Sequence, residues 1–534
     1  MNLKLKSSKG ITLIALVVTI IVILILAGIS INVLAGQNGI LNKTIEAKEK
    51  TNSGQRQEKL ELSNMEELID ENLDETGTSI EKTDDTNPGE LEKESNDIFV
   101  INSIEDLVFF AYDVKNGNAY EGKTVKLGKS LDFNSNKSYV DAFRTDYGKY
   151  GYDGELKENL TSNVGWISIG DAININQNNF KGIFDGGNKT IYNLCINKNN
   201  ITKTIYIGLF ANNQGTVKNL NLKNTKIYTV ANDEIYYFVA GISGNNEGTI
   251  INCTVEGKHQ SKGNYALISG IAGRNQGNIE NCINMSNISG EAMFMSGIVA
   301  QNLCKVSQCG NEGIVNSEKN GTYIGGIAGL GFSENACIEN SYNKGNIFFI
   351  ANVSSHIGGI TGQAQCKVKN CYNSGKISIT ANDSKVKCNI GGIAGIEVDE
   401  LKNCYNKGTI EAKNFGEEVS IGGIIGKYNQ FAVSNVYSET EITLIKSDSA
   451  NKGLLIGVVN NNANIVKMKN LYFYGKEDAF GKNLSGKDIS YVNLEKKAEP
   501  QKILEIVNSD DENKFIEDTN NINDGYPILN WQKN

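Results

Sequence analysis

The sequence predicts an all-β fold, a parallel β-solenoid (β-helix) of about nine or more coils with capping elements, preceded by a long N-terminal transmembrane α-helix. Three observations support this prediction. A short apolar-Gly-apolar unit recurs nine times, a pattern of Cys and Asn keeps a fixed distance from that unit, and residues 11–29 contain no charged side chain. With 534 residues, of which 40% are hydrophobic, the chain can bury a large core.

The recurring unit is typified by IGGIA, which occurs at 324–328 and again at 390–394. Its shared glycines follow one another at intervals of 27 to 34 residues. They are Gly208, Gly241, Gly270, Gly297, Gly326, Gly359, Gly392, Gly423 and Gly457. One such repeat cannot bury its own apolar face, so the repeats are expected to stack as coils about 4.8 Å apart.

A second pattern lies twelve residues after the shared glycine, where five coils carry a cysteine that most often follows an asparagine. The predicted structural ladder consists of Cys253, Cys282, Cys309, Cys371 and Cys404 with Asn252, Asn281, Asn370 and Asn403. An inward Cys packs as a small apolar side chain, and a turn Asn can hydrogen-bond to its equivalents in neighbouring coils. We expect the ladder thiols to be reduced. Cys304/Cys309 and Cys366/Cys371 are better spaced for disulfides.

The first ten residues, MNLKLKSSKG, carry three lysines and no acidic side chain. The uncharged run that follows is long enough to cross a hydrocarbon core of about 30 Å as a helix. Lysines before such a helix favour the cytoplasmic side, which places the remainder outside. The expected location is therefore the cell membrane or cell surface, with the bulk of the chain extracellular. The membrane itself is the expected partner of the N-terminal helix.

The segment KGITLIALVVTIIVILILAG resembles the N-terminal signal of type IV prepilins. The resemblance implies a prepilin peptidase as partner, cleavage between Gly10 and Ile11, and methylation of Ile11. Most pilins carry Glu at the fifth mature position, where this chain has Ala15. This departure argues against polymerisation as a major pilin and leaves incorporation into a pilin-type assembly open. A plain membrane anchor is the alternative interpretation.

Composition divides the chain into seven segments. They are a basic leader (1–10), a transmembrane helix (11–35), a helical stalk (36–75), a disordered linker (76–97), an N-terminal cap with leading coils (98–205), the repeat solenoid (206–470) and a C-terminal cap (471–534). A capping-box-like start at Ser103 predicts a helix that runs to about Asn116 and closes the first coil. Tyr526, Leu529 and Trp531 are predicted to plug the other end.

The repeats resemble the GLUG repeats of bacterial surface proteins. The copies that carry the resemblance are GIAGRNQGNIENCINMSN (270–287) and GGIAGIEVDELKNCYNKGTI (391–410). The resemblance implies an extracellular β-helical domain of an adhesin-type protein and implies no chemistry.

The composition disfavours several classes of site. His259 and His356 are far apart in the sequence and no Cys-x-x-Cys accompanies them, so no metal or other cofactor is predicted. A net charge of −9 argues against nucleic acid as a partner. Asp233 and Asp383, the aspartates between Gly186 and Gly395, lie at distant registers, and we predict no enzyme and no catalytic residue.

Binding is the predicted function. Tyr342, Tyr372 and Tyr405 each follow the ladder position directly, so they should stack along one outer face. Such a face could offer a surface for a glycan or a host or matrix protein, or it could serve only to stabilise the stacked coils. The sequence leaves two alternatives open. One is a polysaccharide-acting hydrolase or lyase on the same scaffold, and the other is a purely structural spacer or minor pilin component.

Overall fold

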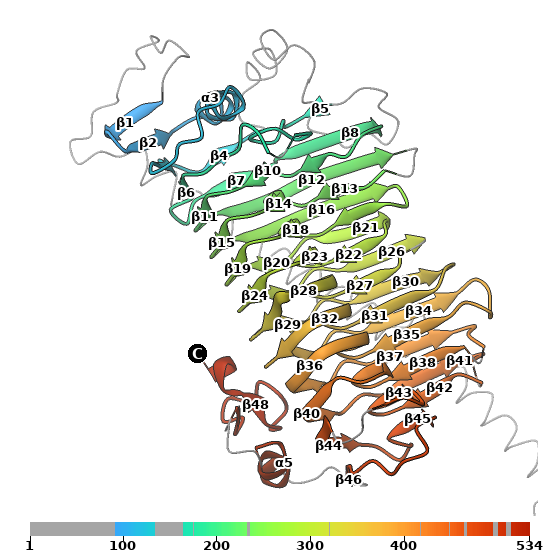
Figure 1. The fold of residues 1–534 in the computed structure, drawn as a ribbon. Coiled ribbons are helices and arrows are strands. Elements are labelled where there is room, and N and C mark those ends of the chain that lie inside the picture. The colour runs from blue at the N-terminus through green and yellow to red at the C-terminus, as the bar shows by residue number, and fades with distance from the viewer. Residues whose placement is uncertain are drawn as a thin grey trace, which may run out of the picture. The chain divides into compact units, whose positions relative to one another are not determined.

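The computed structural model describes residues 91–133, 164–174, 176–231, 235–319, 321–416, 418–447, 449–463, 467–494, 500–508 and 514–533. The chain divides into two compact units, Met1–Thr86 and Asn87–Asn534, and every described residue belongs to the second. That second unit is a stack of parallel coils (Figure 1).

The fold class predicted from the sequence needs one correction. No helix within the described residues has both the length and the apolar character needed to cross a bilayer. The long N-terminal transmembrane helix is therefore not supported, and the fold class becomes an all-β solenoid without it. The segment predicted to form it (11–35) lies outside the described residues, as do Gly10, Ile11, Ala15 and the predicted stalk.

Each coil contributes up to four strands, and the first strands form a parallel sheet of nine. This sheet sets the number of turns at about nine and confirms the predicted parallel β-solenoid. Its strands are β9 (Tyr206–Ile207), β13 (Tyr237–Val239), β17 (Ala266–Ile268), β22 (Phe294–Ser296), β27 (Tyr323–Gly325), β31 (Ser355–Gly358), β35 (Cys388–Gly391), β38 (Val419–Gly422) and β42 (Asn451–Gly453).

The second and third strands of each coil also pair in parallel with their equivalents. The second strands are β10 (Phe210–Asn213), β14 (Ser243–Asn246), β18 (Ala272–Asn275), β23 (Val299–Asn302), β39 (Ile425–Tyr428), β43 (Ile456–Val459) and β45 (Phe480–Asn483). The third strands are β3 (Thr124–Leu127), β6 (Ile183–Asp185), β11 (Thr216–Lys218), β15 (Thr249–Ile251), β19 (Asn278–Glu280) and β24 (Lys305–Ser307). Three strands span both positions without a break: β28 (Ala328–Glu339), β32 (Thr361–Lys369) and β36 (Ala394–Asn406).

The fourth position is often divided between two short strands. Its members are β4 (Leu131–Asp132), β7 (Thr190–Tyr192), β8 (Cys195–Ile201), β12 (Asn221–Ala231), β16 (Thr254–Lys262), β20 (Ile283–Asn284), β21 (Asn287–Glu291), β25 (Gly310–Asn311), β26 (Val315–Lys319), β29 (Tyr342–Asn343), β30 (Ile347–Ala351), β33 (Tyr372–Asn373), β34 (Ile377–Ala381), β37 (Ile410–Lys413) and β41 (Ile442–Ile445). Towards the C-terminus, β40 (Ala432–Ser438) and β44 (Met468–Tyr474) continue from the third position into the fourth, and β46 (Val492–Leu494) pairs with β44. The short strand β5 (Val164–Gly165) pairs antiparallel with β8.

The shared glycine recurs because the coils approach each other closely there. Ile357 and Ile360, which flank the glycine pair of their coil, are fully buried in the core. The N–H of Gly326 donates to the carbonyl of Gly359 in the next coil, at 3.1 Å. A Cβ on Gly359 would lie 2.1 Å from the carbonyl oxygen of Gly392 in the next coil and 2.4 Å from Cγ of the buried Asn373. Any side chain at this position would therefore push against the backbone of the next coil and displace an asparagine of its own coil.

A helix packs against the N-terminal coils. Helix α3 (Ile104–Lys115) begins with the capping box that the sequence indicates, because Ser103 and Asp106 exchange side-chain and backbone hydrogen bonds. Its Phe110 ring lies 5.5 Å from the ring of Phe180 and 5.9 Å from that of Phe184. The predicted helix is confirmed.

Two strands precede this helix. Strand β1 (Glu92–Ser95) pairs antiparallel with β2 (Ile98–Ile101), although residues 92–95 fall within the predicted disordered linker. All four side chains of β1 are exposed, so no apolar alternation indicates a strand there.

The C-terminal segment does not plug the end of the solenoid as the sequence suggests. Strands β44 to β46 add to the stack, and the following segment packs beside β40 and β44 (Figure 1). This lateral segment consists of α5 (Pro500–Val507), β47 (Phe515–Ile516), β48 (Ile528–Leu529) and the 3-10 helix η2 (Asn530–Lys533).

Candidate functional site

The five ladder cysteines point into the core. Cys253, Cys282, Cys309, Cys371 and Cys404 are at most 1% exposed. Each thiol donates to the carbonyl oxygen two residues earlier, at 3.1 to 3.3 Å. Where the ladder lacks a cysteine, the hydroxyl of Ser341 donates to the corresponding carbonyl of Glu339 at 2.8 Å. The position therefore needs a small side chain with one donor.

These thiols are expected to be unreactive. Burial raises the pKa of Cys253, Cys282 and Cys371 well above the ordinary thiol value, so they stay protonated and are poor nucleophiles. All ten cysteines are free thiols, which means that neither Cys304/Cys309 nor Cys366/Cys371 is bridged.

The ladder asparagines occupy a tight turn. Asn252, Asn281, Asn370 and Asn403 have φ values between 49° and 55°, in the left-handed region that asparagine tolerates better than most residues. Their side-chain amides hydrogen-bond from coil to coil, for example from Asn252 to Asn219 at 3.0 Å and from Asn403 to Asn370 at 3.0 Å. We call this set the turn column. With the residues bonded to it, the turn column comprises Asn219, Asn252, Asn281, Asn340, Asn370, Asn403, Asn435 and Asn470.

Two further asparagine columns lie buried inside the solenoid, and the sequence analysis missed both. The corner column joins Asn213, Asn246, Asn275 and Asn302, with spacings of 2.8 to 2.9 Å between amide nitrogen and oxygen. The inner column joins Asn284, Asn311, Asn343, Asn373 and Asn406, at 2.7 to 2.8 Å. The sequence does contain a pattern that could have predicted the corner column, because its asparagines all lie five residues after a shared glycine.

The predicted tyrosine face exists as a stack but not as an exposed surface. The rings of Tyr342, Tyr372 and Tyr405 stack at centroid distances of 5.5 and 5.0 Å, and Tyr437 continues the stack at 4.8 Å. Tyr372 is only 6% exposed and Tyr405 only 1%. The proposed ligand face must therefore be corrected: two of its three members are covered by the protein itself.

The lateral C-terminal segment provides the cover. Trp531 stacks on Tyr342 and Tyr372, with centroids 6.3 and 5.9 Å away, and Phe515 packs on Tyr405. The Tyr405 hydroxyl donates to Oε1 of Gln532 at 3.1 Å. The sequence shows that these tyrosines share a face, but it does not show that a segment more than a hundred residues later in the chain lies over it.

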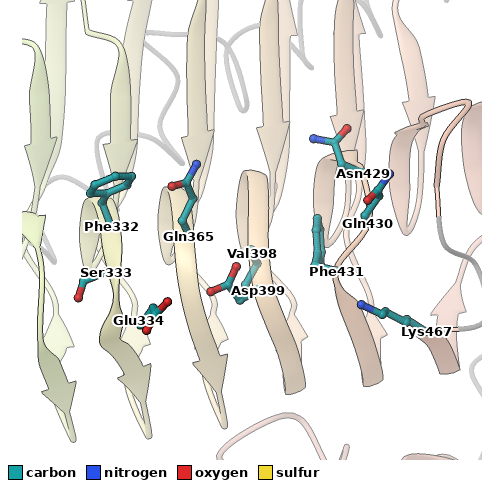
Figure 2. A pocket seen from close by; sticks show the side chains of 10 residues that line it. All are labelled: Phe332, Ser333, Glu334, Gln365, Val398, Asp399, Asn429, Gln430, Phe431 and Lys467. Atoms are coloured by element: carbon teal, nitrogen blue, oxygen red, sulfur yellow. The ribbon is translucent and has the colours of Figure 1, made fainter.

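An open groove on another face collects side chains suited to a ligand. It has a volume of about 600 Å³ and crosses several coils (Figure 2). It is lined by Phe332, Ser333, Glu334, Gln365, Val398, Asp399, Asn429, Gln430, Phe431 and Lys467. Glu334 also borders a smaller hollow of about 240 Å³ that includes Cys337, Lys367 and Lys369.

The groove forms at the corner between the second and third strands, which we call the central corner. In β28, the residues between Phe332 and Cys337 oppose a single residue between Gln365 and Lys367 of β32, so this coil bulges outward. Register shifts recur where β32 pairs with β36. Val398 and Phe431 are buried in the floor, whereas the Phe332 ring is 55% exposed.

Three charged side chains line the groove. Within the described residues, Glu334, Asp399 and Lys467 form no ion pair or hydrogen bond through their side chains. Nearby charges on the same solenoid do pair between coils, as with Lys369 and Glu400 at 2.7 Å. At least one amide side chain of the groove is hydrogen-bonded, because Gln430 donates to the carbonyl of Asn462 at 3.1 Å.

The two histidines do not contribute to the groove. His259 is fully buried, with Nε2 2.9 Å from Oγ1 of Thr225, and its burial lowers its pKa to about 4. His356 stacks on Tyr323 of the neighbouring coil at 5.5 Å. Across the described residues, no group of three or more His, Cys, Asp or Glu side chains could hold a metal ion.

Comparison with known proteins adds little to this geometry. No family model matches the chain, and no curated protein matches it either. A solved structure named "putative immunoglobulin A1 protease from Bacteroides ovatus" is similar over 81% of this chain and 92% of that chain, at 16% identity and a TM-score of 0.29. A similarity at this level carries no argument about function.

Proposed function

We propose that the protein is a non-enzymatic binding protein of the cell surface and that the groove at the central corner is its ligand site. The observation that carries the proposal is an exposed aromatic ring, Phe332, in one groove with charged side chains that form no ion pair or hydrogen bond within the described residues. Aromatic and polar groups that converge in a hollow are typical of binding sites. The tyrosine stack, which is covered, is not part of this proposal.

The resemblances found in the sequence support the proposed location. The similarity to prepilin signals favours export with cleavage between Gly10 and Ile11 by a prepilin peptidase, and the GLUG-like repeats favour exposure on the cell surface. Peptide mass spectrometry of protein from the native cell surface tests this part. A mature chain that begins at Ile11 would support it, and a chain that retains Met1 would contradict it.

Ligand binding is tested with the full chain on arrays of glycans and extracellular matrix proteins. The Phe332→Ala variant is expected to lose affinity by about tenfold or more, because the exposed ring contributes contact area without supporting the core. Phe348→Ala is the matched control, since Phe348 is another exposed phenylalanine and does not line the groove. Equal affinities for the two variants would contradict the proposal.

One observation favours a second candidate function, a polysaccharide-acting hydrolase or lyase. Glu334 and Asp399 line the same groove on β28 and β36, with only β32 between them. Most glycoside hydrolases use a pair of carboxylates that flank the scissile bond. Both side chains are exposed, however, whereas a general acid is normally held in an apolar pocket.

Product formation on a panel of polysaccharides separates the two candidates. Release of reducing or unsaturated ends, abolished by either Glu334→Gln or Asp399→Asn, would establish the enzyme. Binding without any product would favour the binding protein.

A further inference from the structure

The side chains of the groove also indicate what kind of ligand it takes. We propose that the groove binds one extended, uncharged oligosaccharide chain that runs along the solenoid axis. This inference rests on the proposed function, because it names the ligand class of the same site.

The first argument is the spacing of the contacts. Successive coils of a solenoid are about 4.8 Å apart, so groups at the central corner repeat at that interval along the axis. Phe332 lies opposite Gln365 on the neighbouring strand, and Asp399 and Asn429 follow on the next coils (Figure 2). A polymer of sugar units presents its hydroxyls at a regular interval of similar size. The groove therefore offers a repeating ligand one side chain per coil at a similar interval, although the side chains themselves differ.

The second argument is the chemistry of those contacts. Phe332 offers an exposed flat ring, against which the apolar face of a pyranose can stack. Carboxylates such as Asp399 accept hydrogen bonds only, whereas amides such as Gln430 both donate and accept. Hydroxyl groups do both as well, so vicinal hydroxyls match this mixture of carboxylate and amide. Two carboxylates and one ammonium line the groove, which disfavours an anionic polymer.

The third argument concerns a peptide ligand. An extended peptide commonly binds by adding a strand to an unpaired sheet edge. Strand β32 is paired with β28 on one side and with β36 on the other, so the wall of the groove offers no free edge there. The apolar floor residues Val398 and Phe431 are buried and so present little apolar surface to an anchoring side chain. The groove therefore suits a sugar chain better than a peptide.

The test is calorimetric titration of the full chain with neutral oligosaccharides of the cello, xylo, manno and chito series, from disaccharide to hexasaccharide. Polygalacturonate and heparin serve as anionic probes. In at least one neutral series, affinity should rise with chain length and then level off once the groove is filled. Phe332→Ala should weaken that binding by about tenfold or more, with Phe348→Ala unchanged.

Three results would overturn the inference: binding of the anionic polymers alone, neutral binding that Phe332→Ala leaves unchanged, or no neutral binding at all. The array experiment distinguishes these from failure of the proposed function. If Phe332→Ala abolishes binding to a matrix protein while no oligosaccharide binds, the groove is a ligand site but its ligand is a protein. If Phe332→Ala affects neither, the groove is not the ligand site.

Discussion

The central corner has two forms in one molecule. In the coils between Tyr206 and Gly310 it is a tight turn, held by the buried corner column that runs from Asn213 to Asn302. In the coils that follow, the equivalent position, five residues after the shared glycine, holds Gly331, Ala364, Glu397, Tyr428 and Asn462, so only the last of these coils has an asparagine there. There the coils bulge and the groove opens. We call these coils the open half and the coils before them the tight half.

The difference between the two forms of the corner shows how a repetitive fold can acquire a binding groove. The core ladder continues through both halves, because the inner column runs from Asn284 to Asn406 across the change. The side chain at the corner, the length of the turn and the continuity of the strands differ. A groove can therefore open without a cavity in the core.

The largest effect is expected where the tight corner has no room. A Cβ on Gly277 would lie 1.9 Å from the carbonyl oxygen of Gly248 in the preceding coil. Gly277→Ala must move backbone, and we expect local stability to fall by about 3 kcal/mol. Hydrogen exchange of amides in the same coil measures the loss. The exposed neighbour Gln276→Ala is the control, with a change within about 0.5 kcal/mol. A similar change for both variants would contradict the tight-corner account.

A pH-dependent loss of stability of similar size is expected from the half of the solenoid with the tight corner. His259 lies in the tight half and is fully buried, and its pKa is lowered from 6.5 to about 4. The unfolded chain therefore binds a proton as the pH falls below about 6.5, while the folded chain does not. Stability is fully present above pH 6.5, declines towards pH 4, and loses on the order of 3 kcal/mol in total.

Urea unfolding between pH 7.5 and pH 4 measures this contribution. The difference in stability between wild type and His259→Asn should shrink as the pH falls, because the variant lacks the titrating group. A difference that does not change with pH would contradict the assignment.

A smaller loss is expected when one link of the corner column is removed. Asn275 accepts from Asn246 at 2.8 Å and donates to Asn302 at 2.9 Å. Asn275→Ala leaves buried amide groups without these partners and should cost about 2 kcal/mol. Asn335, in the bulge of the open half, is exposed, and Asn335→Ala should change stability by less than about 0.5 kcal/mol. Hydrogen exchange in the two coils compares the variants directly.

The smallest effect is expected for the ion pairs on the surface of the open half. Lys369 and Glu400 pair at 2.7 Å with both side chains partly exposed. Such pairs contribute little, so Lys369→Ala should cost about 0.5 kcal/mol or less. Raising the salt concentration should reduce even that difference. A loss above about 2 kcal/mol would mean that surface charge, rather than the core ladder, stabilises the open coils.

The sequence predicts the parts of this fold that repeat. The interval between shared glycines and the cysteine twelve residues later are local patterns, and they establish the stacked coils and the turn that Asn252 occupies. The packing of Cys253 below it follows from the same stacking.

The groove and the covered tyrosines could not be predicted in the same way. Glu334 lies eight residues after its shared glycine and Asp399 seven residues after its own, so no common register points to them. They share a groove because a bulge in β28 shifts one relative to the other. The cover over Tyr405 depends on a long-range contact with Gln532, which no local pattern encodes.

The direction of the asparagine columns has an electrostatic consequence. In the turn column each amide donates towards the preceding coil, as from Asn252 to Asn219. The corner and inner columns donate towards the following coil, as from Asn246 to Asn275 and from Asn343 to Asn373. Hydrogen-bonded amides in a row polarise one another, so each column behaves as a line of aligned dipoles. Because a buried column in each half opposes the turn column, their fields partly cancel along the axis.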